Sequence, residues 1–161
     1  MPKNIVIDPL DSKSISNAID ELKKYKVWVQ QKENELRLRL AELGKTVASV
    51  QFSSALYDGV NDVFVRVDST GSVAVIYAEG EAVAFIEFGA GATYGYGHPE
   101  ASKFGTGPGT YPNSKGHWND PNGWYYKHDH RSFGNPPAMA MYQAREEMAE
   151  QITQIAREVF A

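Results

Sequence analysis

The side chains of this sequence that could do chemistry are its histidines, which lie in one segment. His128, Asp129 and His130 follow one another, and His117 and His98 precede them. Imidazole and carboxylate groups bind zinc or nickel when three or four of them converge on one point. His128 and His130 point to the same side only where the backbone is extended. One hypothesis is therefore a metal-dependent hydrolase or nuclease that uses His117, His128, Asp129 and His130.

The surroundings of these histidines favour a different interpretation. The sequence has no His-Glu-x-x-His motif and no other familiar metalloprotease or nuclease spacing. It contains no cysteine, which excludes a thiol nucleophile, a disulfide framework and a Cys-type zinc site. In a polar loop of this kind we expect surface or interface histidines, with no metal and no cofactor.

The histidine-containing segment is also rich in glycine and aromatic residues. Ten of the 14 glycines and all 4 histidines fall within the 46 residues of the range 89–134. A stretch of this length without regular structure is uncommon in a compact domain and is usually functional or disordered. Aromatic residues beside glycine, serine and asparagine are typical of protein-binding surfaces. We expect the interface anchors to be Trp118, Trp124, Tyr125 and Tyr126.

Composition and charge argue against several other classes of function. The formal net charge is −4, and the loop offers too few lysines and arginines for an oligonucleotide-stacking surface, so we expect no sequence-specific nucleic acid. The glycine run from Gly89 to Gly97 lacks the lysine of a P-loop. No apolar stretch approaches the roughly 18 residues of a membrane span, and the N-terminus lacks the apolar core of a signal peptide.

A long helix is predicted over 11–43, followed by a stop at Gly44. Ser12 or Ser14 can supply its N-cap, and apolar residues recur at helical spacing. A strict seven-residue series is formed by Ile15, Leu22, Val29, Leu36 and Leu43. Such a helix would be about 45 Å long, more than a domain of this size needs. It could pack in part on a neighbouring subunit, or cover its own sheet with a break near residue 30.

A small, mostly antiparallel sheet is predicted within 46–88. Residues 46–53 alternate loosely, as in a strand, and 62–68 pairs with 72–78 as a hairpin turning at 69–71. Alternation places Val63, Val65 and Val67 on one face, with Phe64 and Arg66 on the other. Residues 82–88 are too short a run to distinguish a strand from a helical turn.

A second helix is predicted over 135–160. Asn135 can act as its N-cap, and Pro136 suits the first helical position because its missing N–H costs nothing there. An apolar stripe runs from Met141 to Val159. The order of helix, sheet, long loop and helix predicts one α+β domain over 1–161, with helices packed on one face of the sheet.

The run Val83–Gly91 reads Val-Ala-Phe-Ile-Glu-Phe-Gly-Ala-Gly. It resembles the (Tyr/Phe)-(Val/Ile)-Glu-Phe-Gly-(Thr/Ala)-Gly signature of small neck or tail-completion proteins of long-tailed bacteriophages and prophages. The order of elements agrees, as does Gly-Trp-Tyr-Tyr at 123–126. The family's aromatic residue after a proline is absent, because Ala138 and Met139 stand there. We expect a fold-defining turn made by Phe85, Glu87, Phe88 and Gly89, in which Glu87 caps or pairs structurally.

This resemblance implies a structural protein of the virion without catalysis. It implies a homo-oligomeric ring, with a hexamer expected, in the tail or neck of a particle assembled in the bacterial cytoplasm. The implied partners are the tail tube or tail terminator on one side and the head-completion protein on the other. The acidic composition would suit a ring through which DNA slides. A monomeric binding module, such as a secreted effector, is a third hypothesis.

Overall fold

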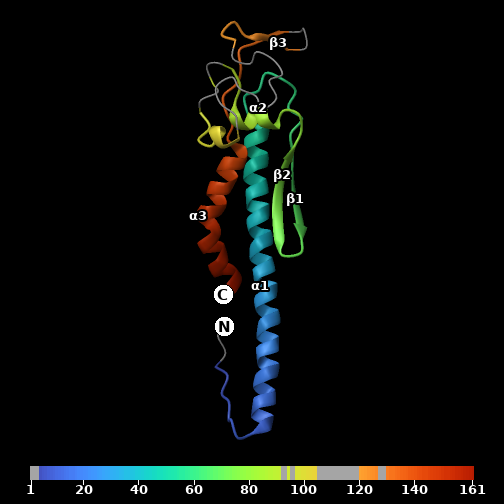
Figure 1. The fold of residues 1–161 in the computed structure, drawn as a ribbon, viewed down its shortest axis with the longest axis vertical. Helices are drawn as coiled ribbons and strands as arrows, with labels where there is room; N and C mark the ends of the chain where they lie inside the picture. Colours follow the sequence, from blue (N-terminus) through green and yellow to red (C-terminus); the bar gives the residue numbers. More distant parts are fainter. Residues whose placement is uncertain (1–3, 92–93, 95–96, 105–119, 127–129) are drawn as a thin grey trace.

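The computed structural model describes residues 4–91, 94, 97–104, 120–126 and 130–161. The long N-terminal helix, the C-terminal helix and the small antiparallel sheets confirm the predicted α+β class (Figure 1). The elements in chain order are α1 (Ser12–Ser53), β1 (Phe64–Thr70), β2 (Val73–Glu79), α2 (Val83–Phe88), the 3-10 helix η1 (Ala101–Phe104), β3 (Trp124–Tyr126), β4 (His130–Ser132) and α3 (Ala140–Phe160).

Helix α1 begins at a different cap from the one predicted. The carboxylate of Asp11 accepts hydrogen bonds from the backbone N–H groups of Lys13 and Ser14, at 2.9 and 3.2 Å. Asp11 is therefore the N-cap, in place of Ser12 or Ser14. The hydroxyl of Ser14 instead accepts a hydrogen bond from the backbone N–H of Asp8 at 2.9 Å, which helps to hold the preceding segment.

Helix α1 also continues past its predicted end. The predicted stop at Gly44 and the predicted strand over 46–53 are both wrong, because α1 runs unbroken to Ser53. Ala41, Gly44, Ala48 and Phe52 are all buried, and their spacing of three and four residues follows one helical face. A Cβ at residue 44 would lie 2.5 Å from Cδ1 of Ile76, so this glycine permits close packing rather than ending the helix.

The predicted hairpin is confirmed, together with its inward and outward faces. β1 and β2 pair antiparallel from Phe64 opposite Glu79 to Thr70 opposite Val73, and Gly71 lies in the turn with φ 63°. Val65 is buried, whereas Phe64 and Arg66 are exposed. Within the described residues this sheet has only the two strands β1 and β2, because the segment 46–53, predicted as a further strand, is helical.

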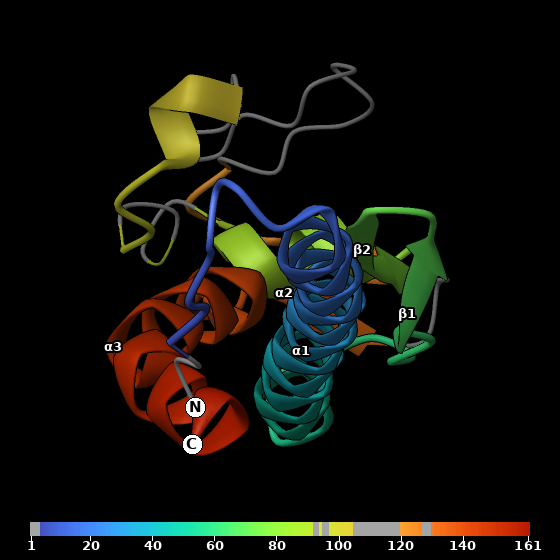
Figure 2. The ribbon, with the colours of Figure 1, turned by 90° about the horizontal axis from the view of Figure 1, so that it is seen from below.

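The core lies where α1, the hairpin, α2 and the start of α3 meet. Helix α1 runs between α3 and the hairpin, as Figures 1 and 2 both show. Phe52, Val65 and Ile86 bring large buried side chains from three different elements. Ala140 and Ala144 carry α3 into the same cluster, and their small side chains allow the helix to approach closely.

Helix α3 starts later than the sequence predicts. It begins at Ala140, after Met139 in the left-handed conformation with φ 52°, and Asn135 is not its N-cap. The backbone N–H and C=O of Asn135 pair with those of Ala90 at 3.0 and 2.9 Å, as an isolated antiparallel bridge. This extended pairing is incompatible with helical geometry at 135. Likewise, the range 89–134 contains η1, β3 and β4 rather than irregular chain alone.

The N-terminal half of α1 extends beyond the other helices. The end of α3 lies beside the middle of α1, where the rings of Trp28 and Phe160 make an edge contact at 5.9 Å. Before that point, the described part of the chain places residues 4–10 beside the first turns of α1 (Figure 1). At 1.5 Å per residue, α1 is roughly 63 Å long. No helix among the described residues is long and apolar enough to cross a membrane.

Candidate functional site

The short helix α2 and the start of α3 are joined by a buried carboxylate. Glu87 is 5% exposed, and its side chain accepts hydrogen bonds from the backbone N–H groups of Met141 and Tyr142, at 2.9 and 3.1 Å. These N–H groups belong to the first turn of α3, which has no side-chain cap of its own. Glu87 thus caps α3 from 54 residues away, and its negative charge lies at the positive end of the helix dipole.

The connection is reciprocal, because the segment before α3 satisfies the carbonyl groups at the end of α2. The side-chain amide of Asn135 donates to the carbonyl of Phe85 at 2.8 Å. The backbone N–H groups of Ala138 and Met139 donate to the carbonyls of Ile86 and Glu87, at 2.8 and 3.2 Å. The last carbonyls of a helix otherwise lack partners, so these bonds fix α2 against α3.

His98 is part of this junction rather than of a metal cluster. It is 6% exposed and lies 3.2 Å from Oε1 of Glu87 through Nε2. The backbone N–H of Glu100 donates to Nδ1 at 3.1 Å, so the proton of the ring is on Nε2 and is donated to Glu87. The ring also packs against Phe88 and Tyr142, with centroids 4.5 and 5.6 Å away. His98 therefore attaches the following segment to α2 and α3.

An ion-pair cluster continues this attachment at the surface. Arg145 on α3 contacts the carboxylate of Glu100 at 2.8 Å, and Lys103 of η1 contacts the same oxygen at 2.8 Å. Hydrogen bonds from Lys103 and then Arg145 lower the pKa of Glu100 to about 2. Hydrogen bonds with Glu100 and Glu146 raise the pKa of Arg145 above its usual range. The charges thus connect η1 to α3 on the outer side of the buried pair.

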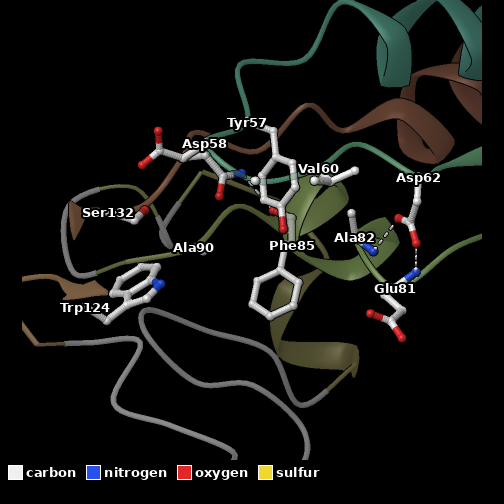
Figure 3. A pocket seen from close by; sticks show the side chains of 12 residues that line it. Tyr57, Asp58, Val60, Asp62, Glu81, Ala82, Phe85, Ala90, Trp124 and Ser132 are labelled. Carbon is white, nitrogen blue, oxygen red and sulfur yellow. Dashed lines mark hydrogen bonds between the residues drawn. The ribbon is translucent and has the colours of Figure 1, made fainter. Parts of the chain in front are cut away.

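A pocket lies on the other side of α2. Its volume is about 280 Å³, and its residues come from the segment after α1, from α2 and from β3 to Asn135. The rings of Tyr57, Phe85 and Trp124 stand around it, as Figure 3 shows. Buried residues, among them Ala90 and Asn135, also line it. The pocket therefore combines aromatic walls with a rigid base that belongs to the α2–α3 junction.

The charged residues that line the pocket are all acidic. They are Asp58, Asp62 and Glu81, and all three are exposed (Figure 3). The carboxylate of Asp62 accepts hydrogen bonds from the backbone N–H groups of Glu81 and Ala82, at 2.8 and 2.9 Å, just before α2 begins at Val83. The pocket can therefore attract a positively charged group to an aromatic surface.

The residues predicted for the turn after the sheet lie together around α2. Phe85, Glu87 and Phe88 belong to α2, and Gly89 follows it with φ 76°. A Cβ at Gly89 would lie 2.8 Å from the backbone nitrogen of Pro137. The expectation that Glu87 caps or pairs structurally is confirmed by its hydrogen bonds to α3.

The predicted interface aromatics are placed in part. Trp124 and Tyr125 lie on β3, which pairs with β4. Trp124 lines the pocket, and Tyr125 is 68% exposed, with the guanidinium carbon of Arg131 5.9 Å from the centroid of its ring. Tyr126 ends β3, and Trp118 lies outside the described residues. Their role as interface anchors stays a prediction.

The predicted metal ligands are not brought together within the described residues. His117, His128 and Asp129 lie outside them, whereas His130 begins β4. Nε2 of His130 is 3.6 Å from Oδ1 of Asp58. Among the residues that the structure describes, no three histidines, aspartates or glutamates are grouped so that they could hold a metal ion. The metal-dependent hydrolase or nuclease stays a hypothesis about the undescribed residues.

The sequence does not predict the pocket, nor the hydrogen bond from Asn135 to the carbonyl of Phe85. The missed lining residues, Tyr57, Asp58 and Asp62, follow α1 in a segment for which the sequence predicts no site. The turn residues Asp58-Gly59 and Asn61-Asp62 were the available local signal, since such residues often precede a helix or strand. No local signal links them to Trp124, more than 60 residues later. Comparison with known proteins does not supply the link, because no family model, curated protein or solved structure matches this chain.

Proposed function

We propose that this chain is a structural subunit of a phage or prophage tail or neck and acts through protein–protein contacts. The resemblance of Val83–Gly91 to the tail-completion signature supports the family. The contacts of these residues are compatible with a structural role, since Glu87 caps α3 and Gly89 permits close approach to Pro137. In this proposal the subunit completes the head-proximal end of the tail and joins it to the head connector.

The observation that carries the proposal is the exposed half of α1. Ile15, Ile19 and Leu22 lie at helical spacing on one face and are 39, 47 and 53% exposed; we call these three residues the α1 stripe. Tyr25 and Val27 nearby are also about half exposed. An apolar stripe on a helix indicates a surface that packs against another element. We therefore expect another protein chain to cover the α1 stripe in the assembly.

A second apolar surface lies on the outward face of the hairpin. Phe64 on β1 and Val73, Val75 and Tyr77 on β2 are exposed there. Subunits of a ring make head-to-tail contacts, which join two different surfaces of the same chain. The α1 stripe and the hairpin face are two such surfaces, and they come from elements that pack on one another. This arrangement supports a homo-oligomeric ring, for which a hexamer is the expectation.

The expected partners of the ring are the tail tube or tail terminator and the head-completion protein. The expected location is the virion, after synthesis in the bacterial cytoplasm. The formal net charge of −4 is compatible with a channel along which DNA slides, because like charges repel the phosphates. A basic inner surface in the assembled ring would contradict that part of the proposal.

Native mass in solution tests the self-association. Light scattering over a concentration series should give species several times heavier than the 17.9 kDa chain. Leu22→Glu should lower the association constant at least tenfold, because it places a charge in the α1 stripe. Gln31→Glu is the matched control, since Gln31 is exposed on the same helix and lies nine residues, or about two and a half turns, beyond Leu22, which places it on the opposite face.

Equal masses for the wild type and Leu22→Glu would contradict the role of the α1 stripe, and a monomer at every concentration would contradict unaided ring formation.

The same sample serves to measure bound metal. Stoichiometric zinc in the purified protein, with activity lost on chelation, would favour the hydrolase or nuclease hypothesis instead.

A further inference from the structure

The pocket beside α2 has a definite chemical character. Its walls include the aromatic rings of Tyr57, Phe85 and Trp124, and its charged lining residues are the carboxylates of Asp58, Asp62 and Glu81 (Figure 3). No lysine or arginine lines it among the described residues. The face of an aromatic ring and a carboxylate both attract cations. The two kinds of group together select a positively charged guest.

The size of the pocket indicates what kind of cation would fit. Its volume of about 280 Å³ lies just below the ~300–1,000 Å³ of pockets for drug-sized ligands. A single long side chain suits such a space better than a nucleotide or another cofactor. The base is apolar or uncharged, since Ala82, Ala90 and Ser132 are buried there. The aliphatic part of an arginine or lysine could pack on this base while its charge meets the carboxylates.

The acidic groups are held at the pocket in different ways. Two backbone N–H groups fix the carboxylate of Asp62, so it stays beside the start of α2. Asp58 and Glu81 are exposed and can approach a guest. Nε2 of His130 lies 3.6 Å from Oδ1 of Asp58. The site therefore offers one fixed and two adjustable acidic groups.

We propose that this pocket receives an arginine side chain from a partner protein. A guanidinium group is planar, stacks on aromatic rings and binds carboxylates through two hydrogen bonds, so it matches the walls and the rim better than the compact ammonium of lysine. Arginine is also enriched at the centres of protein interfaces. The inference rests on the proposed function only in taking the arginine to belong to a partner protein.

Peptide binding tests the inference without any particle or ring. The probe is a short neutral-flanked peptide, acetyl-Gly-Arg-Gly-amide, titrated into the full chain while the indole N–H signals of the tryptophans are followed by NMR. Trp124→Phe assigns the signal of Trp124. The matched probe carries citrulline, which has nearly the same shape as arginine but no charge. We expect the arginine peptide to shift the Trp124 signal saturably, and to bind at least tenfold more tightly than the citrulline peptide.

The double variant Asp58→Asn, Glu81→Gln should weaken binding of the arginine peptide about tenfold or more. Asp62 is left intact because its carboxylate holds the backbone just before α2 through two hydrogen bonds. Glu79→Gln is the control, since Glu79 is an exposed acid on β2 that does not line the pocket. Unchanged circular dichroism shows that each variant is folded.

Three results would overturn the inference: equal binding of the two peptides, no shift of the Trp124 signal up to about 10 mM peptide, or equal binding by the double variant and the wild type. Failure here leaves the native mass unaffected. Conversely, specific arginine binding by a chain that forms no ring and occurs in no particle would uphold the pocket and contradict the proposed function. The two claims can therefore fail separately.

Discussion

At the scale of single residues, the carboxylate of Glu87 provides the N-terminal cap that α3 otherwise lacks. Met139 lies in the left-handed conformation and gives α3 no side-chain cap. Glu87 supplies two acceptors to the first turn instead, and His98 donates to one of the same oxygens. Residues Phe85–Gly89 therefore join two segments that are far apart in the sequence. The joint also borders the aromatic pocket, because Phe85 and Asn135, which hydrogen-bond to each other, both line it.

Replacing Glu87 should destabilise this joint measurably. Glu87→Ala removes a helix cap and leaves His98 without its acceptor, so we expect the free energy of unfolding to fall by roughly 3 kcal/mol. Glu150→Ala is the control on exposed α3 surface, with an expected change within about 0.5 kcal/mol. Urea denaturation measures both variants, and hydrogen exchange should be faster at the amides of Met141 and Tyr142. Equal stability of the two variants would contradict the cap.

Gly89 should tolerate substitution less well than Gly71, another glycine with a positive φ. At Gly89, the φ of 76° and ψ of 168° form a backbone conformation that is essentially restricted to glycine, and an added Cβ would approach backbone atoms of Pro137 and Asn135 to within 2.9 Å. Gly71 has φ 63° but nothing within 4 Å of its would-be Cβ. Gly71→Ala should cost about 1–2 kcal/mol from the positive φ alone, and Gly89→Ala at least about 1 kcal/mol more from the clash and the strained backbone together. Thermal unfolding of both variants checks the order.

At the scale of elements, the sequence predicts the hairpin well and the helix ends poorly. Strict alternation from Val63 to Val67 fits only a strand with one buried face, and the structure has that pairing. Residues 46–53 fit both periods, because Ala48 and Phe52 are four apart while the polar residues Ser49 and Gln51 alternate with apolar ones between them. The helix prevails because Ala41, Gly44, Ala48 and Phe52 form one buried face.

Neither the late start of α3 nor the pocket could be predicted from the sequence, because both depend on contacts between residues that are far apart in the chain. The cap of α3 comes from Glu87, and the backbone of Asn135 is bridged to Ala90, so the deciding contacts join residues about 45 or more apart in sequence. Local cap signals, here Asn135 followed by Pro136, say nothing of such competing partners. The pocket gathers its aromatic rings in the same way, from three separate segments.

The link between η1 and α3 should depend on pH. The pKa of Glu100 is lowered to about 2, so its ionised form is favoured by folding. This stabilisation is complete above the ordinary pKa near 4.5 and is lost as the pH falls from there towards 2. Glu100→Gln should therefore be less stable than the wild type at pH 7, and the difference should shrink between pH 4.5 and 2. A difference that stays constant over this range would contradict the ion pair.

At the scale of the whole molecule, the chain is an elongated body with different surfaces along its length (Figure 1). The α1 stripe lies on the half of α1 that extends beyond α3, and the aromatic pocket lies beside α2 near the other end of α1. Contacts at both ends of a long subunit suit a component placed between two assemblies. In the proposed neck or tail these assemblies are the tail and the head connector.

Trp124 should matter more for assembly than for folding. Its side chain is only half-buried in the described structure, where β3 pairs with β4 and the ring lines the pocket. Trp124→Ala should lower the free energy of unfolding by about 1–2 kcal/mol and leave the chain folded. The yield of particles assembled with this variant should fall at least tenfold, as expected for an interface anchor. Leu56→Ala, at an exposed apolar residue, is the control, and a normal yield with Trp124→Ala would contradict the anchor.

Deletion of the gene from its own phage or prophage tests the central claim most directly. The measurement is electron microscopy of induced lysates, with and without the wild-type gene supplied in trans, and mass spectrometry of the purified particles. The proposal predicts that the protein is present in complete particles, and that the deletion leaves heads and tails unjoined until the gene is restored. Complete, infectious particles that form without the protein would contradict it.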